Sequence, residues 1–437
     1  MNRRQLIASA GGVAILGGLG LGACAKTGPL GAAADPFTGN ALMADVKAYL
    51  DFGRHRSGSP GDEATTAWFA DYWKGLGYTI AHRSFDLPNA DTTAAMLEAG
   101  GEMFEGFAQP PISFTPEGGL KGSLAVWSET ASGDVKGKIA VVHVPRAPGA
   151  VSPSASYRKA FVAARDAGAL GVLAVVSGPS GDVIAINTPK DMTLGIPVLM
   201  VGEKEKARVD AALAAGGEAV LRIEGPGGTR TARNTVATSG TEGPWVIVST
   251  PQSGWFTCGG ERGPGIAMSR ALSAWALTQN VKCRWLFVAT SGHEWTDAGA
   301  HLFHAHDAPG PEETALWFHL GASYGARAYE ETGDGLKPLE GENPVRTLMV
   351  SEDLMASAKA AFAGHVTIEN PTPADLATSL GELTLVLEEG YKSSAGFYGA
   401  HGLFHTPQDG LDATSGAIME PIVRAVAKMI SDKLSGL

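Results

Sequence analysis

The feature that most constrains the fold of this chain is a regular alternation of short apolar runs and amphipathic segments after residue 244. Such an alternation predicts β–α units, in which neighbouring strands run parallel and helices cover both faces of one sheet. The expected strands cover residues 245–250, 284–290, 316–320 and 383–387, and the expected helices cover residues 263–277, 295–306 and 418–434. The predicted fold class is therefore α/β, with a mostly parallel sheet covered by helices on both faces.

Metal-ligand side chains follow one of these strands and recur near the C-terminus. His293 and Glu294 come directly after Ser291-Gly292, where the predicted strand 284–290 stops, and His405 begins the segment His-Thr-Pro-Gln-Asp. Open α/β sheets bind ligands at the carboxyl ends of their strands. Imidazole and carboxylate groups are typical zinc ligands, so this pattern indicates part of a zinc site.

The N-terminus predicts export. Arg3-Arg4 precedes an apolar stretch over residues 6–23, which ends in Leu21-Gly-Ala-Cys24 and resembles a bacterial lipobox. Residues 1–24 are therefore expected to be a signal peptide and lipobox, and residues 25–36 a linker. Acylation of Cys24 would anchor the protein in a lipid bilayer facing the periplasm or cell surface. The alternatives are an uncleaved transmembrane anchor and, for the route, twin-arginine export.

Composition excludes one class of partner. The chain has 437 residues, 44% of them apolar and 18% charged, with a net charge of −11 and no basic tract. This balance predicts a globular protein that does not bind nucleic acid. Once Cys24 carries lipid, Cys258 and Cys283 remain, and the sequence leaves open whether they form a disulfide or stay as free thiols.

A second α/β rhythm occupies residues 111–227. Its expected strands cover residues 138–143, 171–176 and 196–201, with a helix at residues 157–167. The phrases Val135-Lys-Gly-Lys-Ile-Ala-Val-Val, Asp166-Ala-Gly-Ala-Leu-Gly-Val-Leu and Ile196-Pro-Val-Leu-Met-Val resemble those of a protease-associated domain. The resemblance implies a smaller inserted domain that acts as a lid or in binding and has no chemistry of its own.

The flanking segments, residues 37–110 and 228–437, resemble the co-catalytic zinc aminopeptidases, relatives of glutamate carboxypeptidase and glutaminyl cyclase. In that family a strand ends in His-x-Asp, a following loop supplies a bridging aspartate, and Glu-Glu supplies the general base and a ligand. A later strand gives an aspartate, and a late His-Thr-x-x-Asp gives the last imidazole. Here Thr250 and Gln252 stand where the first His and Asp belong, so the first histidine ligand is absent.

The remaining positions imply an altered site. Glu261 stands at the bridging aspartate, Glu294 at the ligand of the Glu-Glu pair, and His405 at the last ligand. The resemblance implies that these three residues hold one zinc ion, the single-metal arrangement of glutaminyl cyclases. His293 then replaces the general base, and His319, near the later aspartate, is expected as a further ligand or an oxyanion stabiliser. The alternative is that Glu261 pairs with Arg262 and that the histidines only satisfy buried groups.

Two functions follow from these alternatives. The first is an exported, lipid-anchored, metal-dependent hydrolase of peptide, amide or related small acyl substrates. The second is a catalytically silent binding module that keeps the pocket without its metals. The missing ligands at Thr250 and Gln252 favour the second, and the retained His405 motif favours the first.

Overall fold

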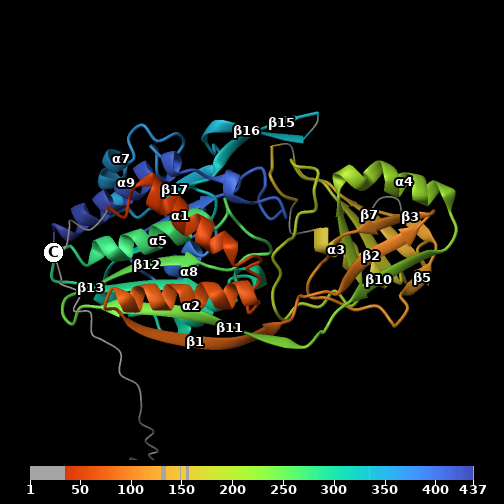
Figure 1. The fold of residues 1–437 in the computed structure, drawn as a ribbon, viewed down its shortest axis with the longest axis horizontal. Coiled ribbons are helices and arrows are strands. Elements are labelled where there is room, and N and C mark those ends of the chain that lie inside the picture. Colours follow the sequence, from red (N-terminus) through yellow and green to blue (C-terminus); the bar gives the residue numbers. More distant parts are fainter. Residues whose placement is uncertain (1–34, 129–133, 148, 154–156, 334, 437) are drawn as a thin grey trace, which may run out of the picture. The chain divides into compact units, whose positions relative to one another are not determined.

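The computed structural model describes residues 35–128, 134–147, 149–153, 157–333 and 335–436. Its largest element is an eight-stranded sheet (Figure 1), ordered β1-β11-β13-β12-β14-β19-β17-β18. The strands are β1 (Thr79–Pro88), β11 (Thr229–Ser239), β13 (Arg284–Thr290), β12 (Trp245–Pro251), β14 (Thr314–His319), β19 (Ser394–Gly399), β17 (Arg346–Val350) and β18 (Thr372–Pro373). The central four, β13, β12, β14 and β19, are mutually parallel. The pairs β1–β11, β11–β13 and β17–β19 are antiparallel, and the edge pair β17–β18 is parallel.

Helices cover both faces of this sheet, as the alternating pattern predicts. Along β12, Val246 and Val248 pack into one apolar core and Ile247 packs into another, because successive side chains of a strand point to opposite faces. The first core is shared with α1 (Gly39–Asp51), α2 (Pro60–Gly75), α5 (Gly263–Ala276), α7 (Met355–Ala361) and α9 (Gly416–Leu434). The second core is shared with α6 (Ala298–His306) and α8 (Leu383–Glu388). The predicted fold class is confirmed.

Two predicted elements differ from the structure. The expected strand at residues 383–387 is wrong, because this segment forms helix α8, in which Leu383 and Val386 are buried one turn apart. The helix predicted from residue 295 begins at Ala298 instead. Thr296 and Asp297 adopt left-handed backbone conformations, with φ of 52° and 59°, and they separate α6 from a short 3-10 turn, His293–Trp295.

Two smaller sheets form within residues 94–224. The first is mostly parallel and contains β4 (Phe107–Ala108), β9 (Val198–Gly202), β8 (Gly171–Val176), β7 (Ile139–Val144) and β6 (Leu124–Trp127). The second contains β3 (Glu102–Glu105), β2 (Ala94–Ala99), β10 (Ala219–Glu224) and β5 (Leu120–Gly122). The helices of this segment are α3 (Arg158–Asp166) and α4 (Lys206–Ala215), and a separate hairpin of β15 (Arg327–Thr332) and β16 (Gly335–Glu342) follows β14.

This segment, called the insert below, begins earlier than the predicted boundary at residue 111. Strands β2, β3 and β4 precede that boundary, yet they pair with β9 and β10 within the insert. An apolar cluster also joins the insert to the large-sheet region and includes Trp255, Phe256 and Trp295. The identity of the insert as a protease-associated domain stays a prediction.

The remaining sequence expectations concern the thiols and the N-terminus. Cys258 and Cys283 are both buried and free, so the disulfide alternative is wrong. The signal peptide, Cys24 and most of the linker lie outside the described residues. Within the described ranges, no helix combines the length and apolar character that crossing a bilayer requires.

Candidate metal centre

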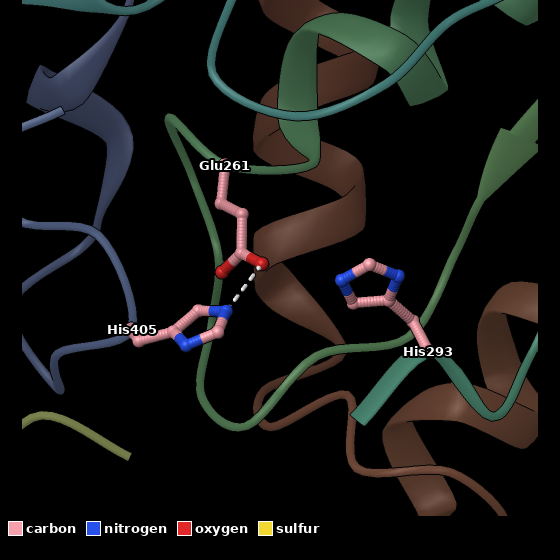
Figure 2. A group of neighbouring side chains, drawn as sticks. All are labelled: Glu261, His293 and His405. Atoms are coloured by element: carbon pink, nitrogen blue, oxygen red, sulfur yellow. Dashed lines mark hydrogen bonds and ion pairs between the residues drawn. The ribbon is translucent and has the colours of Figure 1, made fainter. Parts of the chain in front are cut away.

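The candidate site lies where the four central parallel strands end. Glu261 lies in the loop after β12, His293 in the turn after β13, His319 at the last position of β14, and His405 in the loop after β19. Because adjacent parallel strands end at the same edge of a sheet, four segments distant in sequence meet there. Ligand atoms of Glu261, His293 and His405 all lie within 4.8 Å of one another. Figure 2 shows the Glu261 carboxylate between the two imidazole rings.

Glu261 and His405 are in direct contact. The Nε2 atom of His405 lies 3.1 Å from Oε1 of Glu261, and its Nδ1 lies 2.9 Å from the carbonyl oxygen of Ala185 in the insert. The loop that carries Glu261 is fixed by Asp409, whose carboxylate accepts the backbone N–H groups of Gly260 and Glu261 at 2.6 and 3.0 Å. The His-Thr-Pro-Gln-Asp segment thus supplies both a candidate ligand, His405, and the carboxylate that supports the Glu261 loop, Asp409.

His293 faces this pair, and its Nδ1 atom contacts two carboxylates. Its Nδ1 lies 2.7 Å from Asp297 Oδ1 and 3.2 Å from Glu382 Oε1. Burial and the charge of Arg262 oppose protonation of the ring, yet the two carboxylates raise the pKa of His293 to about 9. A ring that already carries both protons cannot accept another, so this arrangement of His293 does not match the general base that the family resemblance implies.

Arg262 is the nearest cation to Glu261. Its NH2 atom lies 2.9 Å from Glu261 Oε1, and each of these two side chains is only 1% exposed. Burial alone would raise the pKa of Glu261, but Arg262 and His405 outweigh that effect and lower it, so the carboxylate is ionised. Glu261 Oε2 has no hydrogen-bond partner among the described residues. The ion pair with Arg262 anticipated as an alternative is present, and it leaves one carboxylate oxygen available.

Glu294 does not join the cluster. Its carboxylate accepts hydrogen bonds from the Ser57 backbone N–H at 2.9 Å, from Ser57 Oγ at 2.7 Å and from Ser253 Oγ at 2.6 Å. Among the described residues, it belongs to no group of three ligand atoms within 4.8 Å of one another. The structure thus brings together Glu261 and His405 of the three predicted ligands, and places His293 with them where Glu294 was expected.

Thr250 and Gln252, which stand where the family has its first His and Asp ligands, form hydrogen bonds with neighbouring groups of the protein. Thr250 Oγ1 donates to the Leu320 carbonyl at 3.0 Å. Gln252 Nε2 donates to Asp62 Oδ1 at 2.8 Å and to Thr66 Oγ1 at 2.7 Å. Both side chains are buried, and these contacts hold Thr250 Oγ1 and Gln252 Nε2, whereas Oε1 of Gln252 has no hydrogen-bond partner among the described residues.

His319 lines the cavity beside the cluster. Its Nδ1 lies 2.9 Å from Ser249 Oγ, which also accepts a hydrogen bond from Trp317 Nε1 at 2.8 Å. Because the indole can only donate, the Ser249 hydroxyl proton is left for His319 Nδ1, and the ring proton then resides on Nε2. Burial lowers the pKa of His319, which favours this neutral form. His319 is thus arranged as a hydrogen-bond donor.

These residues surround a cavity of about 270 Å³. Its polar wall comes from Arg262, His293, Asp297, His319, Glu382 and His405, and apolar side chains of Ile186, Phe397 and Phe404 complete it. The insert closes one side, since Ala185 N donates to the His405 carbonyl at 3.0 Å and Thr188 N donates to the Glu294 carbonyl at 2.9 Å.

Sequence reasoning missed two of the polar residues in this cavity, Asp297 and Glu382. Asp297 follows His293 by four residues, but the sequence predicts it inside a helix, and its left-handed backbone has no sequence signal of its own. Glu382 precedes a segment whose apolar run predicts a strand, and this pattern gives no signal for the Glu382 side chain.

Comparisons with known proteins relate this geometry to solved structures. A zinc aminopeptidase from Bacillus subtilis superposes with a TM-score of 0.71 at 16% identity, covering 91% of this chain and 96% of that one. A peptidase M28 precursor from Shewanella amazonensis gives 0.69 at 16% identity, with 89% and 91% covered, and an aminopeptidase from Aneurinibacillus gives 0.61 at 17% identity, with 91% and 94% covered.

The chain has the fold of the zinc aminopeptidases. This confirms the fold that the sequence resemblance predicted, and the similarity extends over nearly the whole length of those aminopeptidases. A scan of protein-family models and a search of curated protein sequences both find no match to this chain.

Proposed function

We propose that this protein is a metal-dependent hydrolase of amide bonds in small peptide or related acyl compounds, with one zinc ion held by Glu261, His293 and His405. The zinc aminopeptidase fold supports the reaction class. The cluster of ligand-type atoms at the carboxyl ends of the strands supports the position of the metal. Relative to the sequence prediction, His293 takes the place of Glu294 as the third ligand.

The contact between His405 and Glu261 carries the proposal. The Ala185 carbonyl can only accept a hydrogen bond, so His405 Nδ1 must carry a proton. In a neutral ring, Nε2 is then an acceptor, and it lies 3.1 Å from an ionised carboxylate oxygen. Two acceptors at this distance need a cation between them, either a second ring proton or a metal ion. A metal ion meets that need and also uses the unpartnered Oε2 of Glu261.

The surroundings of both imidazoles fit zinc. A metal-bound histidine usually donates its other ring N–H to a carboxylate or a backbone carbonyl, which fixes the ring and raises its basicity. His293 has Asp297 and Glu382 at Nδ1, and His405 has Ala185. Two imidazoles and one carboxylate form a ligand set of catalytic zinc sites, which keep a fourth position open.

The reaction adds water across an amide, so the carbon–nitrogen bond breaks, a carbon–oxygen bond forms, and the amine leaves with a proton. Bound zinc supplies a water of pKa about 7 and polarises the carbonyl. His319 donates from Nε2 to the carbonyl oxygen as negative charge develops there, which is the function of an oxyanion-stabilising group. The insert on one side of the cavity and its apolar wall limit the access of bulk water to this step.

A silent binding module is the second candidate, and one observation favours it. Arg262 already supplies a positive charge to Glu261 at 2.9 Å, so the carboxylate is partly neutralised without a metal. This arrangement weakens zinc binding relative to a site without the arginine, because the two cations repel each other.

Hydrolysis of N-acetyl amino acids and dipeptides by the purified protein tests the proposal. We expect turnover that a chelator abolishes and that added zinc restores, with His405→Ala inactive under both conditions. Asp307→Asn is the matched control, because Asp307 pairs with Arg83 at the far end of α6. Turnover that survives complete removal of metal contradicts the proposed mechanism, and zinc-loaded protein without turnover favours the binding module.

A further inference from the structure

The guanidinium of Arg262 is deeply buried and incompletely satisfied. Its Nε donates to the Ser253 carbonyl at 3.0 Å, and its contact with Glu261 is an ion pair outside hydrogen-bond geometry. Neither NH1 nor NH2 has a hydrogen-bond partner among the described residues, although the side chain is only 1% exposed. Buried donors without acceptors are costly, which distinguishes Arg262 from an arginine placed for stability alone.

Other buried arginines of the chain show the contrast. The guanidinium of Arg270 lies 3.6 Å from the ring centres of both Trp68 and Tyr72 and pairs with Asp45. Arg346 donates to the carbonyls of Tyr324 and Val366. Nε of Arg270 also has no hydrogen-bond partner among the described residues, but two rings and a carboxylate surround its guanidinium, and neither Arg270 nor Arg346 lines the cavity, whereas Arg262 does.

Each carboxylate of the cavity contacts a histidine as well. Glu261 is shared between Arg262 and His405, and the two other carboxylates of the cavity, Asp297 and Glu382, both contact His293. An arginine side chain stays protonated in proteins, and Nη1 and Nη2 of Arg262 have no hydrogen-bond partner among the described residues. The cavity therefore presents a fixed cationic fork next to the proposed metal ligands.

A planar guanidinium with two unused nitrogens matches a carboxylate, which it can bind through two parallel hydrogen bonds. The cavity of about 270 Å³ lies below the ~300–1,000 Å³ of drug-sized pockets, so its ligand is small. Ile186, Phe397 and Phe404 offer contacts to an apolar side chain. We propose that Arg262 binds the α-carboxylate of a small N-acyl amino acid with an apolar side chain.

This inference rests on the proposed function for the reacting bond and extends it to a substrate class. In an N-acyl amino acid the α-carboxylate lies next to the amide, so a carboxylate on Arg262 places the amide carbonyl near Glu261 and the proposed metal. Arg262 is thereby a specificity-determining residue, which selects acids over the corresponding amides.

Binding of N-acetyl-leucine and N-acetyl-leucinamide tests this inference, because the two compounds differ only in the carboxylate. Calorimetry on full-length protein stripped of metal removes zinc as an alternative partner for the acid. We expect the acid to bind at least about tenfold more tightly than the amide, as for hydrogen bonds between charged groups. Equal affinities, or no binding of the acid, overturn the inference.

Two variants locate the effect. Arg262→Lys keeps the charge but loses the two parallel hydrogen bonds, so the preference for the acid should become smaller without disappearing. The charge-balanced double variant Arg262→Met with Glu261→Gln avoids an unpaired buried carboxylate and should lose the preference entirely. Arg270→Lys is the matched control and should keep it. An unchanged preference in the folded double variant excludes Arg262.

The outcome is separable from that of the proposed function. Protein that distinguishes the acid from the amide but never binds zinc supports Arg262 and refutes the metal-dependent hydrolase. Protein that binds zinc and cleaves amides without distinguishing the two compounds supports the metal-dependent hydrolase and refutes the function of Arg262 in substrate selection.

Discussion

Nε2 of His405 lies 3.1 Å from Oε1 of Glu261, and both atoms are acceptors when the imidazole is neutral. Nε2 is an acceptor because Nδ1, on the opposite side of the ring, donates a hydrogen bond to the Ala185 carbonyl and therefore carries the proton of the neutral ring. A backbone group of the insert therefore determines the state of a candidate metal ligand after β19. The insert is part of the site as well as one of its walls.

Removing one backbone donor of the insert tests this coupling. Ala185→Pro deletes the N–H that donates to the His405 carbonyl, and it should loosen the ring and weaken zinc affinity by about tenfold, as for other groups that orient metal ligands. Competition with a chromophoric chelator measures the affinity. Ala185→Gly keeps both backbone groups and is the control. Equal affinities of the two variants contradict the coupling.

The carboxylates behind His293 lead to a second prediction. Asp297→Asn keeps the size of the side chain but removes the charge 2.7 Å from Nδ1, which makes the ring a weaker ligand. Zinc affinity should fall by about 10–100-fold. Asp307→Asn, beyond the other end of α6, should leave it unchanged. If both variants bind zinc as the unmodified protein does, His293 is not a ligand.

A buried carboxyl group behind the site predicts a pH dependence of stability. Burial raises the pKa of Asp62 to about 7, although Ser291, Gly58 and Gln252 all donate to it. The folded state therefore retains this proton better than the unfolded state, in which the pKa is about 3.9. The resulting stability is complete below about pH 4 and is lost as the pH rises to about 7, by up to about 1.4 kcal/mol per unit.

Asp62→Asn should remove this contribution. The free energy of unfolding, measured with urea between pH 5 and 7.5, should fall more steeply with pH for the unmodified protein than for the variant. The comparison concerns slopes, because the substitution also lowers stability uniformly by disturbing three hydrogen bonds. Parallel slopes mean that Asp62 is ionised throughout this range in the folded protein.

Much of the fold and part of the site could be predicted from the sequence. The apolar runs located β12, β13 and β14. The strand-end rule placed His293 at the site, and the family resemblance placed Glu261 and His405 there. Residues 383–387 were misassigned because a five-residue apolar run satisfies both the strand and the helix pattern when its burial is unknown.

The sequence had no signal that His293, rather than Glu294, would lie with Glu261 and His405. Both residues lie in one 3-10 turn after Gly292, and neighbouring side chains of such a turn point in different directions. Glu294 points to hydroxyl donors at Ser57 and Ser253, which are distant in sequence, and His293 points to Glu261. Only the tertiary arrangement decides which of the two can meet a metal.

The lipid anchor stays a proposal, and its test concerns Cys24. Cys24→Ser removes the thiol that acylation requires, so the variant should leave the membrane fraction or remain unprocessed. Metabolic labelling with a fatty acid, followed by fractionation, measures both effects. Cys258→Ser is the matched control, since Cys258 is buried in the folded protein. Lipid label retained by Cys24→Ser contradicts the anchor.

The metal content of purified protein tests the central claim most directly. Elemental analysis of the unmodified chain, prepared without chelator and loaded with zinc, should give one equivalent. Glu261→Ala, His293→Ala and His405→Ala should each lose it, because two ligands do not hold a tight tetrahedral site. Glu294→Gln, whose carboxylate contacts only Ser57 and Ser253 among the described partners, should keep it. Zinc absent from the unmodified protein, or a full equivalent retained by His405→Ala, contradicts the account.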